Sequence, residues 1–455
     1  MTAYIVYILI HLIILLTSIS SNAVSVAFPE ITSSFNASLV LAGWVISIYQ
    51  LVAVCTSVII GSICDILGRK TVFLVCTGLF ILGSILCAIA PNIQILIVSR
   101  FIQSFGGGGI VPVVVGIIVD LFPRSRQKAI GLSVSFFTIG GIIGPNIGAA
   151  LLTAFGWRSI FWLNVPSGIL ACIPLFFLLK TDKRKGGHVN LQGTVYLTGM
   201  IFAIMIGLSQ IGDAVTHNGW LYVIILFAIG ILFLLLLIRH ETKAKEPVID
   251  LELLKRKPFA AADFYNIIYG ACVFGVSSFI PLFAISVYGM SELQSSRVLS
   301  VRSIGMILAT IASSFFALRW GYRRPLLAGT LLISISIFIM GLEPHNLSIL
   351  GNDLSPLIVL CILNLVFGIG MGVSTPASSN CCIDLLPEKA ASITGVIGMF
   401  RMGGGAVCIP IITLFLQYMD NISTGFQVTL IGIGIVALAT IPFIFIMHER
   451  NRDKL

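Results

Sequence analysis

Three arginines lie inside long apolar runs of this sequence, and they are the residues with the clearest chemistry. Arg100, Arg302 and Arg401 stand about six, five and ten residues inside their runs. A charge inside a membrane costs roughly 2.5 to 3.5 kcal/mol on insertion scales, so each arginine must have a role. An arginine-lined cavity without acids would repel cations and favour carboxylates, phosphates or sulfonates. The alternative for each is a structural hydrogen bond to backbone carbonyls of a neighbouring helix.

Groups that could carry a proton are few. No carboxylate falls near the middle of an apolar run, and Asp263 comes closest, just inside the end of one. His11 is the only histidine within a run, where a packing or lipid-interface role is the alternative. Because a buried group that changes its protonation state can carry a proton, Asp263 and His11 are the candidate proton carriers.

Patterns typical of catalysis and metal binding are absent from the sequence. It contains no HExxH motif, no nucleotide-binding GxxxxGK[ST] and no paired acids at depth. The ten cysteines include no CxxC motif and are expected to be apolar packing residues. A channel would need a repeated filter, which the sequence lacks. We therefore predict neither an enzyme nor a cofactor or metal site.

The elements that hold these residues are membrane-spanning helices. Of the 455 residues, 57% are hydrophobic and 10% are charged, and the mean hydropathy is +1.06. Apolar runs of about 20 residues cross a hydrocarbon core of about 30 Å as helices. The runs predict fourteen spans, near residues 4–28, 39–60, 71–90, 95–119, 129–153, 159–179, 191–212, 219–238, 262–285, 297–318, 325–342, 357–380, 391–417 and 425–446.

The placement of the 27 lysines and arginines predicts the orientation in the membrane. Most of them fall in the loops that lie on one side, whereas the opposite loops hold only Arg158 and, at a helix end, Arg297. The positive-inside rule therefore places both termini in the cytoplasm, in a multi-pass protein of the cell membrane. The net charge of +9 then reflects topology rather than binding to nucleic acid. The first span is long and has no basic segment before it, so we expect a retained helix rather than a cleaved signal.

An internal repeat defines the architecture. Residues 106–123, GGGGIVPVVVGIIVDLFP, match residues 370–387, GMGVSTPASSNCCIDLLP, at a shift of 264 positions (370 − 106). We therefore expect an all-α integral membrane fold with 14 transmembrane helices. It would consist of two parallel-repeat six-helix bundles, residues 1–185 and 246–455, with an inserted helix pair at 186–245. The shift superposes Gly106 on Gly370, Pro112 on Pro376, Asp120 on Asp384 and Gly140 on Gly404, and a second match aligns Gly68 with Gly321.

Five stretches together resemble signatures of the major facilitator superfamily, in its fourteen-helix branch of drug:proton antiporters. GSICDILGRK, residues 61–70, resembles the loop signature after the second helix, with Ile66 where a basic residue is usual. RFIQSFGGG resembles the helix 4 signature, with Ser104 where glycine is usual. The other three are GGIIGPNIG, which resembles the helix 5 antiporter signature, and WRSIFWLNVPSG and EPVIDLELLKRKPF, which are similar to stretches of the fourteen-helix branch.

The resemblance implies a conformational latch and a gating helix. Asp65, Arg69 and Asp120 would form a charge network that is made in one conformation and broken in the other, although they could instead anchor the loop to lipid headgroups. Leu318 replaces the acid in the second copy, which predicts a weaker latch there. Other positions carried over are Gly61 and Gly68 in the loop, Arg100 in helix 4, and Gly140, Gly144, Pro145 and Gly148 in helix 5, where plain helix packing is the alternative.

The resemblance also implies export of small amphipathic or drug-like compounds by alternating access, driven by proton antiport and performed by a monomer. Arg302 and Arg401 would line the cavity, and their charge favours an anionic or neutral hydrophobic cargo. Asn22, Trp44 and Tyr49 would add polar and aromatic surface. The branch often carries an acid where Ser20 stands, which leaves open a facilitator or a lipid or fatty-acid exporter without tight proton coupling. A membrane-embedded enzyme or sensor is the alternative from another class.

Overall fold

A computed structural model describes most of the chain. The described residues are 2–122, 126–178, 190–211, 214, 219–244, 255–344, 347–349, 352–385 and 390–449. Within these ranges, the side chains of some helical positions lie outside the description, among them Asp65, Asp120 and Phe137, and so does the burial of Gly61.

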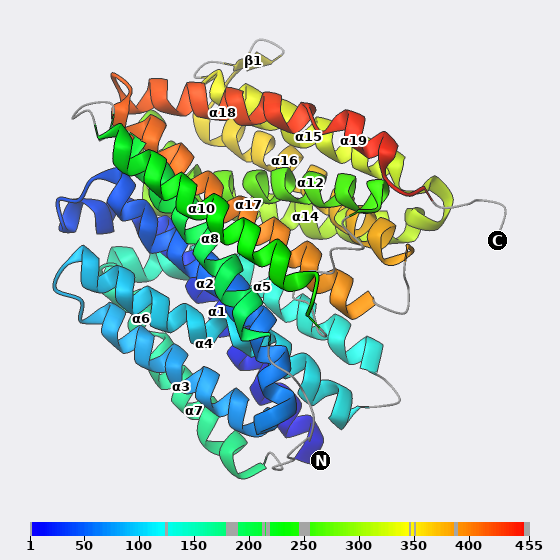
Figure 1. Cartoon of the computed structure of the whole chain (residues 1–455). Helices are drawn as coiled ribbons and strands as arrows, with labels where there is room; N and C mark the ends of the chain where they lie inside the picture. The colour runs from blue at the N-terminus through cyan, green and yellow to red at the C-terminus, as the bar shows by residue number, and fades with distance from the viewer. Residues whose placement is uncertain are drawn as a thin grey trace. The chain divides into compact units, whose positions relative to one another are not determined.

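The first half consists of long helices (Figure 1), and capping residues mark where two of them begin. The side chains of Ser38 and Asn92 accept hydrogen bonds from backbone amides in the first turns of the second and fourth helices. The helices are α1 (Thr2–Ser34), α2 (Leu39–Leu67), α3 (Arg69–Ala88), α4 (Ile93–Leu121), α5 (Arg126–Phe155), the short α6 (Arg158–Trp162) and α7 (Asn164–Leu178), followed by α8 (Leu191–Ser209) and α10 (Trp220–Glu241).

The second half repeats this order with one irregular span. Its first span contains a π-helical segment, η1, between two α-helices. The helices are α12 (Lys257–Gly270), η1 (Ala271–Val276), α13 (Ser277–Tyr288), α14 (Glu292–Trp320), α15 (Arg323–Gly341), α16 (Pro356–Ile383), α17 (Ala390–Tyr418), α18 (Ile422–Leu438) and α19 (Ile441–Ile446). Two three-residue strands, β1 (Leu347–Ile349) and β2 (Asn352–Leu354), form an antiparallel pair between α15 and α16.

The predicted all-α membrane fold is confirmed. Among the described residues, thirteen helical segments are long and apolar enough to cross a membrane, and Ile139–Phe155 within α5 forms a shorter apolar helix. Each of the fourteen predicted spans coincides with one helix or one continuous helix series. The inserted helix α10 exposes much of its aliphatic surface, including Leu221, Ile224 and Leu235. Such a surface suits contact with lipid.

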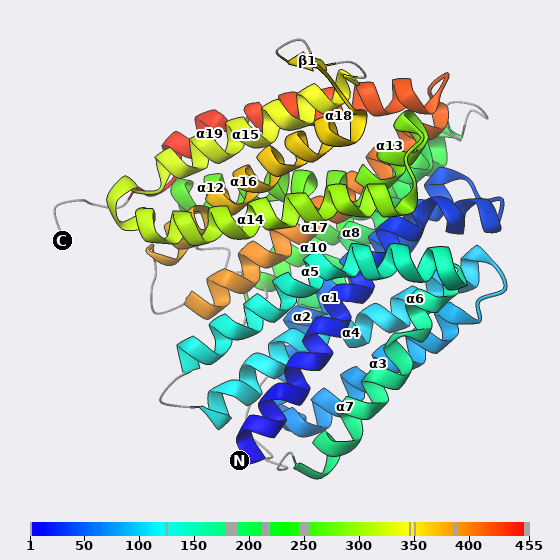
Figure 2. The same cartoon turned by 180° about the vertical axis from the view of Figure 1, so that it is seen from behind.

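The internal repeat is visible in the helix pairings. In the first half α1 packs on α5, and α4 packs on both α2 and α3; in the second half α12 packs on α17, and α16 packs on both α14 and α15. Figure 2 shows α16 lying between α14 and α15. The aligned glycines Gly68 and Gly321 both follow a helix with positive φ, 82° and 70°, a conformation that favours glycine. The two halves are therefore built alike.

Contacts divide the chain into two compact units, residues 1–202 with 229–248 and residues 203–228 with 249–455. The core of the first unit includes Phe73, Phe80 and Ile110, which are all fully buried. In the second unit Phe279, Phe367 and Phe426 are among the largest buried side chains. Each unit contains one polar cluster around an arginine, Arg100 in the first and Arg401 in the second, and further candidate residues lie outside these clusters.

Candidate functional site

Arg401 of α17 is the centre of a polar cluster in the second unit. The side chain is half-buried, and every acceptor that contacts it is neutral. The amide oxygen of Asn266 accepts from Nε, and Nη2 donates to the Ser378 and Ser379 hydroxyls and the Thr375 carbonyl, at 2.7, 2.5, 3.1 and 3.3 Å. Across the residues that the structure covers, no carboxylate pairs with this guanidinium. The cluster therefore holds a positive charge that is hydrogen-bonded but not neutralised.

Helix packing explains why these residues meet. A Cβ atom on Gly270 would collide with the backbone of Arg401, and one on Gly404 would collide with the backbone of Ile267. The two glycines thus let α12 and α17 approach closely, which brings Asn266 to Arg401. Gly404 is the repeat partner of Gly140, so the sequence match here marks a shared packing position.

An aromatic wall borders the cluster. The ring centroid of Tyr269 lies 5.2 Å from the Arg401 guanidinium, within the range of a cation–π contact. The Tyr269 hydroxyl lies 2.6 Å from the Thr375 hydroxyl and donates to the carbonyl of Met371. Tyr265 stacks on Tyr269 with a ring separation of 6.0 Å. Both rings are buried in this conformation, with exposed fractions of 5% for Tyr269 and 2% for Tyr265.

Asp263 lies on α12, three residues before Asn266. It is only 3% exposed, and in the described part of the chain neither carboxylate oxygen has a hydrogen-bond partner. Burying an ionised carboxylate without partners costs several kcal/mol. The group is therefore expected to carry a proton in this conformation. Sequence reasoning placed Asp263 near a helix end but did not connect it with Asn266 and Arg401.

Arg302 of α14 is a separate buried cation. It is 8% exposed, and its Nη1 has no hydrogen-bond partner among the residues described. Gly368 of α16 lies against its backbone, so α14 and α16 are in close contact at this point. The hydrogen bonds of the structure do not join Arg302 to the Arg401 cluster.

Arg100 of α4 is the centre of the polar cluster in the first unit, and it is 1% exposed. Its Nε donates to the backbone carbonyl of Val45 at 3.1 Å, and Nη1 donates to the Gln103 amide oxygen at 2.5 Å. The guanidinium also lies 4.2 Å from the ring centroid of Tyr49. Tyr49, predicted to line a cavity, thus covers Arg100. The bond to Val45 is the backbone contact that was the structural alternative for this arginine.

A neutral network extends from Gln103 through four helices. The Gln103 amide donates to the Ser84 hydroxyl at 2.8 Å and to the Ser20 hydroxyl at 3.4 Å. Asn164 donates to the same two hydroxyls at 3.3 and 3.0 Å. All four residues are fully buried. Ser20, which stands where the resembled branch often has an acid, is therefore part of an uncharged network that sequence reasoning missed.

The other cavity and proton-carrier predictions lie in α1 and α2. Asn22 is half-buried, and its amide donates to the carbonyl of Ser18 in the same helix. Trp44 is half-buried, with its ring 6.0 Å from that of Phe202. His11 is 1% exposed; its Nδ1 lies 2.5 Å from the carbonyl of Tyr7, and its ring centroid is 4.9 Å from that of Phe136. His11 is thus enclosed by aromatic rings rather than facing an opening.

The glycines of the predicted gating segment all face α1. A Cβ on Gly140 would lie 2.6 Å from Cβ of Ser18, and one on Gly148 would lie 2.7 Å from Cβ of Ala23. Gly144 faces the backbone of Ile19 in the same way, and Pro145 lies inside α5. These residues let α5 and α1 pack backbone to backbone. The close contact between α5 and α1 is required for plain helix packing and for gating alike.

The latch of the first unit is described in part. Arg69 follows Gly68 at the start of α3, and its Nη1 donates to the backbone carbonyl of Gly116 on α4. Gly116 stands one helical turn before Asp120, so Arg69 reaches the part of α4 that the latch prediction requires. The side chains of Asp65 and Asp120 lie outside the description, and the three-residue network stays a prediction.

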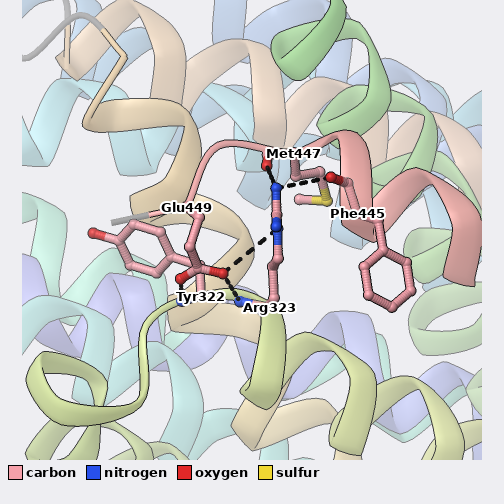
Figure 3. Close-up of polar contacts among 5 residues, drawn as sticks. All are labelled: Tyr322, Arg323, Phe445, Met447 and Glu449. Carbon is pink, nitrogen blue, oxygen red and sulfur yellow. Dashed lines mark hydrogen bonds and ion pairs between the residues drawn. The ribbon is translucent and has the colours of Figure 1, made fainter. Parts of the chain in front are cut away.

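In the second unit, the loop between α14 and α15 receives a carboxylate from Glu449 (Figure 3). The Glu449 carboxylate accepts from the backbone amides of Tyr322 and Arg323 at 2.7 and 3.1 Å, and it lies 3.6 Å from Nε of Arg323. Arg323 also donates to the carbonyls of Phe445 and Met447. Leu318 predicts a weaker latch here, and this stays a prediction. Glu449 supplies the loop with a carboxylate that sequence reasoning did not identify.

A second contact ties this loop to α16. The Tyr322 hydroxyl donates to a carboxylate oxygen of Asp384 at 2.5 Å. Asp384 is the repeat partner of Asp120, and Tyr322 follows Gly321 as Arg69 follows Gly68. The two copies therefore connect the same helices with different residue types.

Comparisons with known proteins agree with this architecture. The family model described as the Major Facilitator Superfamily matches residues 10–409, and it matches again over 298–453. Multidrug resistance protein 3 of Bacillus subtilis (strain 168) is 29% identical over 422 residues, which cover 90% of this chain and 78% of that protein. Riboflavin transporter RibZ of Clostridioides difficile (strain 630) is 29% identical over 393 residues, 85% of this chain and 82% of that protein.

A solved structure shares the fold. The crystal structure of a POT family transporter in complex with 5-aminolevulinic acid superposes with a TM-score of 0.71 and covers 97% of this chain and 95% of that one. The two sequences are 16% identical, so the similarity concerns the fold alone.

Proposed function

Since this chain belongs to the Major Facilitator Superfamily, we propose that it exports small amphipathic compounds across the cell membrane by alternating access, in exchange for protons. The multidrug resistance relative supports an efflux role. The observation that carries the proposal is that α12 holds a buried, unpartnered Asp263 three residues before Asn266, which accepts a hydrogen bond from Arg401 of α17. We propose further that the protein acts as a monomer with both termini in the cytoplasm.

Charge balance decides which cargo is compatible with proton exchange. In an antiporter the proton and the cargo must compete for the same site. A proton on Asp263 leaves the Arg401 cluster with a positive charge, which would help an anion to bind rather than displace it. A neutral cargo with hydrogen-bond donors would bind an ionised Asp263 more tightly than the protonated carboxyl group, which is a weaker acceptor. Proton exchange at Asp263 therefore favours a neutral aromatic amphipath.

The aromatic wall supports the same class of cargo. Tyr269 and Tyr265 would contact a planar ring, while Asn266, Ser378 and Ser379 offer hydrogen bonds beside it. The similarity to a riboflavin transporter agrees with a neutral, flat molecule that carries polar groups.

A second candidate function follows from the unpaired guanidinium. An anionic amphipath could bind Arg401, and the inside-negative membrane potential would then drive its exit without protons, at about 2.3 kcal/mol per charge for 100 mV. Such a protein would be an anion facilitator.

Proteoliposomes with an enclosed pH-sensitive dye separate these functions. A neutral aromatic probe such as riboflavin is expected to move protons in the opposite direction when it crosses the membrane. Because this exchange transfers one positive charge per proton, a potassium-diffusion potential should also change its rate; the movement of protons is what marks antiport. If an anionic aromatic sulfonate moves instead, follows the imposed potential and shifts no protons, the facilitator is the correct function and the antiport proposal is refuted.

A further inference from the structure

Two adjacent cysteines of α16, Cys381 and Cys382, form a feature that transport does not explain. Their sulfur atoms lie 4.0 Å apart, and the residues are 1% and 0% exposed. Neighbouring residues of a helix normally point in directions about 100° apart and do not face each other. The convergence of these two sulfurs is therefore a specific arrangement of the side chains. They are the only adjacent cysteines in the sequence.

The separation is close to the distance between two ligands of one metal ion. Two metal–sulfur bonds of about 2.3 Å in a linear two-ligand complex place the sulfurs about 4.6 Å apart. A rotation of the two side chains that widens the 4.0 Å separation by about 0.6 Å would give this spacing. Thiolates select soft ions such as Cu(I) over magnesium or calcium. Since the described residues contain no group of three or more His, Cys, Asp or Glu that could hold a metal, the pair suits an ion that accepts two ligands.

The surroundings favour a monovalent ion. Cys381 donates to the backbone carbonyl of Ser378 at 3.3 Å, and the hydroxyl of the same Ser378 accepts from Arg401. Both thiols are within electrostatic range of the Arg401 guanidinium. Asp263 is also within electrostatic range of Cys381, and it carries no charge when protonated. In that state two thiolates around a monovalent cation carry one net negative charge, which Arg401 neutralises, whereas a divalent ion would leave the arginine charge uncompensated.

We propose that Cys381 and Cys382 form a two-thiolate site for a soft monovalent cation of the Cu(I) and Ag(I) class. Binding replaces two S–H bonds with two metal–sulfur bonds and releases two protons to water, with no change of oxidation state. Asn380, directly before the pair, is exposed. An occupied site would hold α16 fixed beside the serines that bind Arg401.

The test is Cu(I) binding by the purified full chain under anaerobic conditions, in competition with a coloured Cu(I) chelator. The wild-type protein is expected to bind one Cu(I) that the double variant Cys381→Ser/Cys382→Ser does not bind. The matched control Cys272→Ser/Cys408→Ser removes two other buried thiols and is expected to retain the ion. Equal binding by the wild type and the Cys381→Ser/Cys382→Ser variant, or loss of binding in the control, would overturn the proposal.

Two further measurements distinguish loss of the metal site from a folding defect and from a transport defect. Each single variant, Cys381→Ser and Cys382→Ser, is expected to elute as a single species in size-exclusion chromatography and to bind Cu(I) at least about a hundredfold more weakly. Arg401→Gln is expected to weaken binding about tenfold, and unchanged binding would refute the charge argument. Chelator competition does not depend on transport. A failure to bind Cu(I) therefore leaves the proposed function unaffected, and a failure of the proposed function leaves the Cu(I) site unaffected.

Discussion

Replacing Glu449 with alanine should open the latch of the second unit. The wild-type carboxylate caps the start of α15 through two backbone amides, those of Tyr322 and Arg323. A hydrogen bond to a charged group contributes roughly 1.5 to 3 kcal/mol when buried, and we count about 1 kcal/mol for each because the Glu449 side chain is 34% exposed. The Arg323 side chain is 39% exposed, so its ion pair with Glu449 contributes close to zero to the free energy of closing the latch. The expected loss is about 2 kcal/mol, or about 30-fold in the equilibrium between closed and open latch.

Hydrogen exchange of the loop measures this change directly. In Glu449→Ala, the amides of residues 321–324 should exchange about 30-fold faster when opening is rapid and reversible. The neighbouring variant His448→Ala is a suitable control, and its exchange should match that of the wild type. Unchanged protection of the loop in Glu449→Ala would refute the assignment of Glu449 as the acid of this latch.

Three other substitutions test the clusters. Gly404→Ala should destabilise the protein by about 1 to 3 kcal/mol because its Cβ meets the backbone of Ile267, whereas Gly403→Ala, with open space around it, should leave the midpoint of thermal unfolding unchanged. Gln103→Leu should cost about 3 kcal/mol, since it leaves Nη1 of the buried Arg100 without its partner; an unchanged unfolding midpoint would contradict this. Arg401→Gln should reduce binding of an anionic aromatic probe about tenfold in equilibrium dialysis and spare a neutral one; equal loss for both would contradict the charge argument.

The spans and the repeat could be predicted from the sequence because both depend on local patterns. An apolar run long enough to cross the membrane must form a helix, since the backbone has no other hydrogen-bond partners there. Glycine pairs such as Gly68 with Gly321 and Gly140 with Gly404 recur at matching positions of the two copies, so the repeat can be found without knowing which helix each glycine contacts. These features were confirmed in the structure.

The polar clusters could be predicted only in part. Arg100, Arg401 and Asp263 stood out because charge is rare inside apolar runs. Their neutral partners did not, since Gln103, Ser84 and Asn164 look like ordinary polar residues until four helices bring them together. Glu449 was missed for a related reason: it lies 127 residues from Tyr322 in the sequence. A fixed spacing can reveal contacts within one helix, but not those between helices.

Proton movement by Asp263→Asn tests the central claim most directly. The amide has nearly the shape of the carboxyl group but cannot exchange a proton. In proteoliposomes, the variant should still exchange a labelled neutral aromatic cargo for unlabelled cargo, while the enclosed pH dye reports no proton release on net transport. Proton release at the wild-type level in Asp263→Asn would show that another group carries the proton, and it would contradict the account.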